Sequence, residues 1–194
     1  MKTFLLLSAL LLSTCSAFFL GAADQSRRPK LKKELLDLAV QTKRGLVATP
    51  QQTKRIQELF VALEKLNPTR QPLKSPLINA DWSLEYTTSD SIVGKGDLFP
   101  KIGPIVQTID TTSLSARNSE VVSYFGIPVP RQITAELIPQ DSKLTNVQFK
   151  RFQIGPIGFN APASFKGQLD ITYLDNDLRL TRGDKGNLFV LTRM

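Results

Sequence analysis

Residues 167–193 read Gly167-Gln-Leu-Asp-Ile-Thr-Tyr-Leu-Asp-Asn-Asp-Leu-Arg-Leu-Thr-Arg-Gly-Asp-Lys-Gly-Asn-Leu-Phe-Val-Leu-Thr-Arg193. Apolar and polar side chains alternate here in three short runs, which is the period of a strand with one buried face. The runs are separated by Asp175-Asn176 and by Gly183-Asp-Lys-Gly186. These residue types tolerate positive φ or cap their own backbone. The pattern therefore predicts three consecutive antiparallel strands joined by tight turns.

The same period of two extends upstream, with glycines and prolines between the runs. The candidate strands are Trp82–Thr88, Ile105–Thr111, Glu120–Phe125, Gln132–Ile138, Thr145–Ile154, Lys166–Leu174, Leu178–Arg182 and Leu188–Arg193. About eight short, regularly punctuated strands indicate an antiparallel barrel or sandwich. We favour a mainly β, eight-stranded barrel over residues 77–194, because closure at about eight strands leaves an interior that can hold one small ligand.

Two helices are predicted before the strands, within residues 31–68. Apolar residues recur at helical spacing over 31–41. Thr49 can cap the second helix, Pro50 suits its first turn, and Gln52 can complete a capping box. Its apolar stripe ends at Asn67-Pro68. The opposite face mixes both charges, so we expect packing on the domain core rather than a basic membrane-surface helix.

The N-terminus has the order of a secretory signal peptide over residues 1–17. A basic Lys2 is followed by an apolar run and by small residues ending at Ala17. The run is shorter than the roughly 20 apolar residues that span a bilayer. An uncleaved anchor and a lipoprotein box at Cys15 are the alternatives. Residues 18–30 are basic and are predicted to be a second leader of the transit-peptide type.

Charge and composition exclude several functional classes. The net charge is +8, but residues 34–194 hold 19 basic and 16 acidic residues, so most of the excess lies in the leader. A basic nucleic-acid surface is therefore not expected, whereas weak attraction to an anionic membrane remains. Histidine is absent and Cys15 is the single cysteine. Without the leader, a disulfide, a Cys/His zinc site, a Ser-His-Asp triad and a cysteine nucleophile are all excluded.

Three blocks of the chain resemble the plastid lipid-associated protein family, also called plastid fibrillins. The stretch Tyr173-Leu-Asp-x-Asp-Leu-Arg-x-x-Arg-Gly-Asp-Lys-Gly-Asn-Leu-Phe-Val-Leu191 is similar to the family's C-terminal signature. Residues 79–88 resemble its Gly-x-Trp-x-Leu-x-Tyr-Thr strand, with Ala80 in place of the usual Gly, and more loosely the Gly-x-Trp motif of lipocalins. Residues 106–110, followed by Asn118, resemble its second strand region. Ser16-Ala17 before Phe18 resembles the bipartite plastid leader of diatoms and related algae.

This resemblance implies a lipocalin-like barrel behind two helices, located in the plastid at thylakoids or plastoglobules. It implies a non-enzymatic protein without metal or cofactor that binds or scaffolds carotenoids, quinones or tocopherols and has a structural and photoprotective role. The alternative is an interaction protein whose barrel is filled by its own aromatics and whose helices dock an isoprenoid-synthesising enzyme or a membrane complex. A carboxylate enzyme would require a buried carboxylate facing an open pocket.

Candidate site residues are the aromatic and basic side chains of the strands. Trp82 is expected at the closed barrel end with Arg179 stacked on it. Pockets for small hydrophobes are mostly apolar, so the candidate ligand-binding residues are Trp82, Tyr86, Phe125, Phe149, Phe152, Tyr173 and Arg179. Phe152 and Ile154 alternate with Phe149 and Arg151, so their strand cannot bury all of them on one face. The family register assigns structural or ligand-polar roles to Asp175, Asp177, Gly183 and Gly186.

Overall fold

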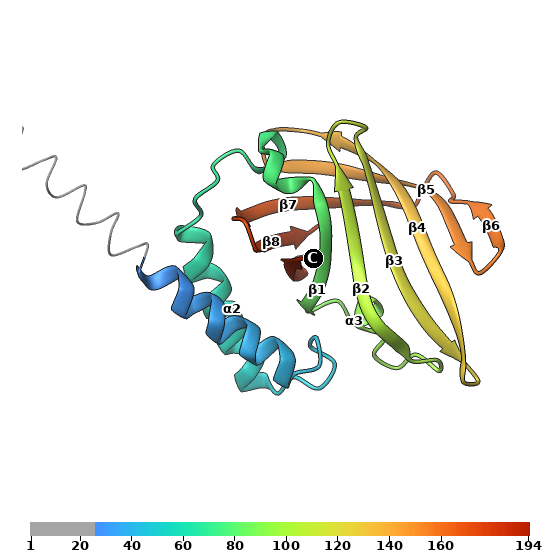
Figure 1. The fold of residues 1–194 in the computed structure, drawn as a ribbon, viewed down its shortest axis with the longest axis horizontal. Helices are drawn as coiled ribbons and strands as arrows, with labels where there is room; N and C mark the ends of the chain where they lie inside the picture. The colour runs from blue at the N-terminus through green and yellow to red at the C-terminus, as the bar shows by residue number, and fades with distance from the viewer. Residues whose placement is uncertain (1–25) are drawn as a thin grey trace, which may run out of the picture.

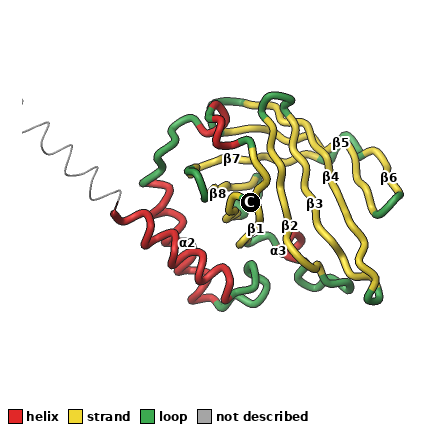
Figure 2. Tube along the Cα trace, in the orientation of Figure 1, coloured by secondary structure: helices red, strands yellow, loops and turns green. Residues whose placement is uncertain are grey.

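The computed structural model describes residues 26–194 (Figure 1). The predicted signal peptide, residues 1–17, and residues 18–25 of the predicted leader lie outside the described residues. The described chain folds into a β-barrel with a layer of two helices packed on one side of it, as the tube in Figure 2 shows. No helix within this part of the chain is long and apolar enough to cross a bilayer.

Eight antiparallel strands close into a ring, which confirms the predicted fold class. Their order is β1-β2-β3-β4-β5-β7-β8-β9, and the ring is closed by the β1–β9 and β4–β5 pairings. The short β6 pairs only with β5. The bounds are β1 Ala80–Thr87, β2 Lys101–Asp110, β3 Ser115–Tyr124, β4 Ile127–Pro139, β5 Leu144–Ile154, β6 Ile157–Asn160, β7 Lys166–Leu174, β8 Leu178–Gly183 and β9 Leu188–Arg193.

The helices precede the barrel, as predicted. The first covers residues 26–41, so it includes residues 26–30 of the segment that the sequence assigned to the leader. Helix α2, Pro50–Lys65, is capped by Thr49, whose side chain accepts a hydrogen bond from the Gln52 N–H, and the Gln52 side chain completes the capping box. The short helices η1 (Pro72–Lys74), η2 (Pro76–Ile78) and α3 (Asp90–Val93) lie in the connections.

The core has two layers, one inside the barrel and one beneath the helices. The barrel interior is filled around Trp82, Leu84, Ile109, Leu137 and Ile171. The second layer packs both helices against the outer face of β1, β7, β8 and β9. Its buried members are Leu35, Ala39, Ile56, Leu59, Phe60, Leu63, Tyr86, Tyr173, Leu178, Leu180, Leu188 and Val190. The apolar stripe of α2 therefore packs on the domain rather than facing solvent.

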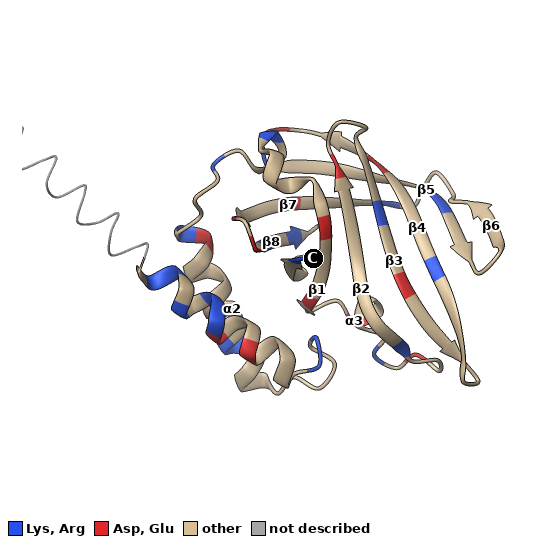
Figure 3. Ribbon diagram, in the orientation of Figure 1, with Lys and Arg blue, Asp and Glu red and all other residues tan. Residues whose placement is uncertain are grey.

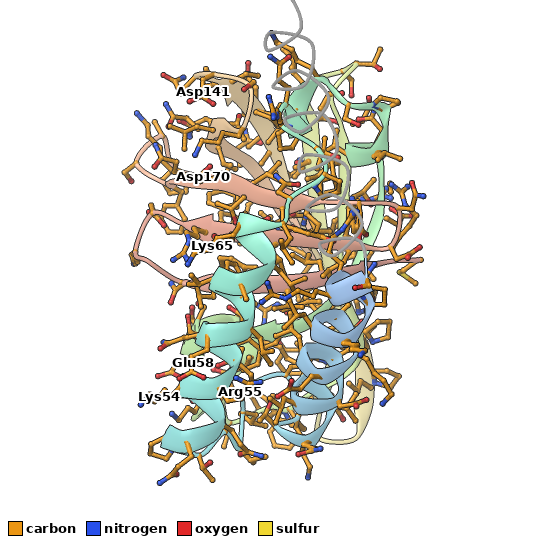
Figure 4. The ribbon with its side chains drawn as sticks, turned by 90° about the vertical axis from the view of Figure 1, so that its left-hand side faces the viewer. Lys54, Arg55, Glu58, Lys65, Asp141 and Asp170 are labelled. Carbon is orange, nitrogen blue, oxygen red and sulfur yellow. The ribbon has the colours of Figure 1, made fainter. Side chains whose placement is uncertain are left out.

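Ion pairs connect the two helices to each other and connect α2 to the barrel. Arg55 reaches from α2 towards the first helix, where its Nε lies 2.7 Å from Glu34 Oε1 (Figure 4). Arg182 of β8 donates from Nε and Nη2 to the two carboxylate oxygens of Glu64, each at 2.7 Å. Figure 3 shows both charges intermixed on the helices and the barrel strands, which agrees with the nearly balanced charge expected for this region.

Three β-bulges decide which face of the barrel several aromatic residues occupy. In β1 the pairing steps from Leu84 to Tyr86 while β9 advances by one residue, so Glu85 is the extra residue. By the same count Thr172 is extra in β7 against β8, and Lys150 is extra in β5 against β4. Because side chains alternate, one extra residue moves every following side chain to the opposite face.

Candidate ligand-binding site

The barrel encloses a cavity of about 540 Å³ that opens at one end. The open end is formed by the start of β2, β4, β7 and β9 and by the end of β1, β3, β5 and β8. The inner wall is mostly apolar, as small-molecule sites usually are. Its apolar lining residues are Leu84, Ile92, Ile105, Val106, Ala116, Ile133, Ala135, Val147, Phe149, Phe152, Ile154, Phe159, Leu169, Phe189 and Leu191.

The closed end is built around Trp82, the single tryptophan of the chain. Its indole N–H donates to the carbonyl of Ile78 at 2.9 Å. The Arg179 guanidinium carbon lies 5.1 Å from the ring centroid, so the predicted stacking is present. Arg193 makes a second such contact at 4.8 Å. Sequence reasoning missed Arg193, although its position opposite Trp82 in the β1–β9 pairing accounts for the contact.

Arg179 is almost completely buried, with 1% of its surface exposed. Its Nη2 donates to Gln107 Oε1 at 2.5 Å, and Gln107 Nε2 donates to Asn118 Oδ1 at 2.9 Å. All three residues line the cavity. Burial lowers the pKa of the Arg179 guanidinium to about 9, because no nearby carboxylate offsets the lost hydration.

The bulge at Lys150 places both Phe149 and Phe152 on the cavity wall. Arg151 is not among the lining residues, so the side chains of this strand do not all share one face, as expected, but Phe149 joins Phe152 because strict alternation does not hold across a bulge. Ile154 lines the cavity as well. Phe152 stacks on Phe159 of β6, with ring centroids 5.6 Å apart. The short β6 hairpin thus adds an aromatic side chain to the wall.

Tyr86 and Tyr173 occupy the opposite face from the one expected. The bulges at Glu85 and Thr172 turn these tyrosines outward, into the apolar layer beneath the helices. Neither is among the residues that line the cavity. Their assignment as ligand-binding residues assumed unbroken alternation, which the two bulges interrupt.

Phe125 lies at the tip of the β3–β4 hairpin, with 89% of its side chain exposed and a φ of 50°. It was expected to end a strand and face the pocket. The sequence placed the turn at Pro128 and Pro130, but these prolines lie within β4, opposite Ser123 and Val121. The turn is therefore made by Phe125-Gly126, and Phe125 is not among the residues that line the cavity.

A polar cluster that the sequence did not predict lies at the open end. Lys101 Nζ is 2.8 Å from Glu120 Oε2, and both side chains are mostly buried. Arg131 Nε lies 3.5 Å from the other Glu120 oxygen. All three residues line the cavity. The side chains meet because Glu120 and Arg131 are paired residues on β3 and β4, a relation that single-sequence periodicity does not show.

Asp175 organises the β7–β8 turn and connects it to the first helix. Its Oδ1 accepts from the N–H groups of Asp177 and Leu178, and its Oδ2 accepts from Lys32 at 2.8 Å and from the Tyr173 hydroxyl at 2.6 Å. Burial would raise the pKa of Asp175, but these hydrogen bonds outweigh it and hold the pKa below its ordinary value. Burial also raises the pKa of Tyr173, and its bond to Asp175 adds to this.

The other motif positions belong to the turns. Asp177 is exposed and lies 3.2 Å from Lys32 Nζ. Gly186 has a φ of 71°, which favours glycine in the β8–β9 turn. A Cβ on Gly183 would lie 3.0 Å from the Phe189 ring, so this glycine allows the ring to pack closely. Within residues 26–194, no group of three or more His, Cys, Asp and Glu side chains is placed to hold a metal ion.

Exposed apolar side chains are concentrated around the open end of the barrel. They lie on the β3–β4 hairpin, on the β5–β6 hairpin and the connection that follows it, and on the segment that leads into the start of β2. The two hairpins project at the right of Figure 1. The exposed residues of this rim are Leu98, Ile102, Phe125, Ile127, Ile154, Ile157, Phe159 and Phe165. Phe99 packs against Tyr124 and Phe125, with ring centroids 4.7 and 5.1 Å away. The cavity therefore opens between apolar projections.

The described chain is thus an eight-stranded antiparallel barrel with an internal cavity and a Trp–Arg contact at its closed end. The PAP_fibrillin family model matches residues 29–192, and the chain belongs to this family, as the C-terminal motif predicted.

Individual relatives agree with this assignment. The chain is 36% identical over 177 residues to probable plastid-lipid-associated protein 5 of Arabidopsis thaliana, covering 90% of this chain and 72% of the relative. Probable plastid-lipid-associated protein 8 of the same plant is 30% identical over 168 residues, covering 82% and 70%. Plastoglobulin-1 of Pisum sativum is 30% identical over 217 residues, covering 84% and 60%. All three are chloroplastic, which confirms the predicted plastid location.

Proposed function

We propose that the barrel binds one hydrophobic isoprenoid or lipid, such as a carotenoid, quinone or tocopherol, at thylakoids or plastoglobules. In this role the protein stores or scaffolds its ligand and helps to protect photosynthetic membranes, without catalysis. The observation that carries the proposal is the cavity of about 540 Å³, which is within the size range of small-molecule sites. Burying apolar ligand surface there contributes about 25 cal/mol per Å².

If the protein instead docked an isoprenoid-synthesising enzyme, its barrel would be filled by its own aromatic side chains. Phe149 and Phe152 instead form part of a cavity wall. The apolar face of α2 is already covered, since Ile56, Leu59, Phe60 and Leu63 are buried in the layer between helices and barrel. Both observations support a carrier over a docking protein.

A side chain introduced at Gly167 tests the cavity directly. Gly167 lines the cavity, and a Cβ there would lie 3.9 Å from the Phe149 ring, which is an ordinary contact. Gly167→Phe should therefore fill the cavity and reduce the lipid that copurifies from a plastid fraction by about tenfold, measured by organic extraction and mass spectrometry.

The matched control is Thr134→Phe, because Thr134 lies between the cavity-lining Ile133 and Ala135 and so points outward. It should leave the copurifying lipid unchanged. Equal lipid content in both variants, with both proteins folded by circular dichroism, would contradict binding inside the barrel. A wild-type protein that carries no lipid would contradict the proposed function altogether.

The apolar rim supports docking of the open end on a lipid surface. Phe125 and Leu98 are 89% and 84% exposed, and Ile157 is 69% exposed. Clustered exposed apolar side chains mark protein or membrane contact sites. Insertion of the rim into the head-group region would bring the cavity opening to the lipid phase, so that a ligand could pass between them without crossing water.

Substitutions at the rim test this docking. The double variant Phe125→Ser, Ile157→Ser should weaken binding to galactolipid vesicles by about tenfold or more, since each side chain loses a contribution of roughly 1.5–3 kcal/mol. Leu114→Ser with Ile138→Ser is the control, because Leu114 lies in the β2–β3 turn and Ile138 near the end of β4, both exposed and both at the closed end. Cosedimentation measures both. Equal losses in the two double variants would mean that the rim has no special part in docking.

A further inference from the structure

Arg179 is a buried cation for which the barrel supplies no counter-ion. Its Nε and Nη1 are buried and have no hydrogen-bond partner among the described residues. Nη2 is satisfied only by a neutral amide oxygen, that of Gln107. A buried charge is costly unless it is paired and hydrogen-bonded. The hydroxyl of Thr181, which also lines the cavity, is likewise buried without a hydrogen-bond partner among the described residues.

The hydrogen bonds that begin at Arg179 have one possible direction. Because a guanidinium can only donate, Gln107 must turn its oxygen towards Arg179. Its amide nitrogen then donates to Asn118 Oδ1 at 2.9 Å. Asn118 is left with its amide nitrogen as a donor at the cavity wall. Bonds in such a chain polarise one another, so the positive charge of Arg179 strengthens this last donor.

The charge of the cavity wall adds to this polarity. Five Lys and Arg residues but only two acidic residues line the cavity. One acid, Glu120, is already paired with Lys101 at 2.8 Å and with Arg131 at 3.5 Å. The other, Asp184, belongs to the β8–β9 turn at the open end. Neither is available to Arg179, and the wall as a whole attracts an anion.

We propose that the occupant of the cavity is a monocarboxylate with an apolar tail, which binds with its carboxylate beside Asn118 and Arg179 and its tail towards the open end. The inference rests on the proposed binding of one lipid or isoprenoid in the cavity, but it names an acid as that ligand in place of a neutral carotenoid, quinone or tocopherol. A singly charged carboxylate matches a single buried cation and the few donors present at the closed end. The tail would lie along Ile133, Phe149 and Phe152, on the apolar part of the wall.

Matched ligand pairs test the head group. Calorimetric titration of the purified protein with laurate and with lauryl alcohol compares a fatty acid with its neutral analogue, and retinoate with retinol does the same for an isoprenoid tail. We expect each acid to bind about tenfold or more tightly than its alcohol, because a charged hydrogen bond replaces a neutral one. Preference in the first pair alone points to fatty acids, and in the second alone to isoprenoid acids. Either result supports the carboxylate.

Three variants separate the head-group site from stability. Arg179→Met should abolish the preference for acids, whereas Arg117→Met removes the same charge from an exposed position beside Asn118 and should preserve it. Gln107→Glu places a carboxylate next to Arg179 and stands in for the ligand. It should raise the melting temperature of the unliganded protein and also abolish the preference, so the proposal does not depend on Arg179→Met folding.

The outcomes distinguish this proposal from the proposed function. Equal affinity for acids and alcohols in the wild-type protein would overturn the carboxylate site and leave lipid binding intact. A Gln107→Glu variant that is no more stable than wild type and still prefers acids would also overturn it. Binding of no acid and no alcohol, together with no copurifying lipid, would overturn both proposals.

Discussion

Replacing Trp82 by alanine is expected to lower the free energy of unfolding by about 3–5 kcal/mol, the usual range for truncating a buried large aromatic. The ring is fully buried, its N–H donates to Ile78, and two guanidinium groups lie over it. Truncation would open a void at the closed end and leave Arg179 without its stacking partner. Urea unfolding followed by far-ultraviolet circular dichroism measures the loss.

The control for this prediction is Trp82→Phe, which keeps most of the apolar volume but removes the N–H donor. Trp82→Phe should lower the free energy of unfolding by less than Trp82→Ala does, because only the hydrogen bond to Ile78 and part of the packing are lost. If Trp82→Ala lowered the free energy of unfolding by less than about 1 kcal/mol, the ring would not be a central element of the barrel core.

Replacing Asp175 by alanine is expected to lower the free energy of unfolding by about 2–4 kcal/mol at neutral pH. The carboxylate accepts two backbone N–H groups, the Tyr173 hydroxyl and Lys32. Its loss would leave these donors without their acceptor. Asp177→Ala is the control, because the Asp177 side chain is 79% exposed and an exposed ion pair contributes little. Similar losses in both variants would contradict the structural role of Asp175.

The contribution of Asp175 should also depend on pH. The pKa of this carboxyl is lower in the folded protein than its ordinary value of 3.8. The folded state therefore favours the ionised form, and the stabilisation is fully present above the unfolded pKa. It is lost as the pH falls through the folded pKa, so the difference between wild type and Asp175→Ala should shrink below about pH 4. A difference that stays constant down to pH 2 would contradict the assignment.

Much of the fold could be predicted because its signals are local. The capping box at Thr49 and the turn at Asp175-Asn176 each depend on residues within a few positions of one another, and the structure contains both. The alternation within β8 and β9 was equally readable. The Arg179 contact with Trp82 is not local, and it was predicted from the attraction of a guanidinium to an aromatic face rather than from spacing.

The faces of the aromatic residues could not be predicted, because a bulge exists only in relation to the partner strand. Nothing about a glutamate or a lysine marks a bulge in the sequence. Yet the bulge at Glu85 turns Tyr86 outward, and the bulge at Lys150 places Phe152 on the same inner face as Phe149. The same limit applies to the Lys101–Glu120–Arg131 cluster, which depends on register between β3 and β4. The contact of Trp82 with Arg179 at the closed end was thus predicted, whereas the set of aromatic residues that line the cavity wall was not.

Closure of the barrel has a consequence for the proposed docking at a lipid surface, where copies of the protein would be crowded. An open sheet presents unpaired N–H and C=O groups along its edge strands, and these can recruit neighbouring chains into aggregates. Here the β1–β9 and β4–β5 pairings leave the short β6 as the free edge among the described strands. Neighbouring copies packed at high density would therefore find little exposed backbone to join, which favours remaining folded and separate.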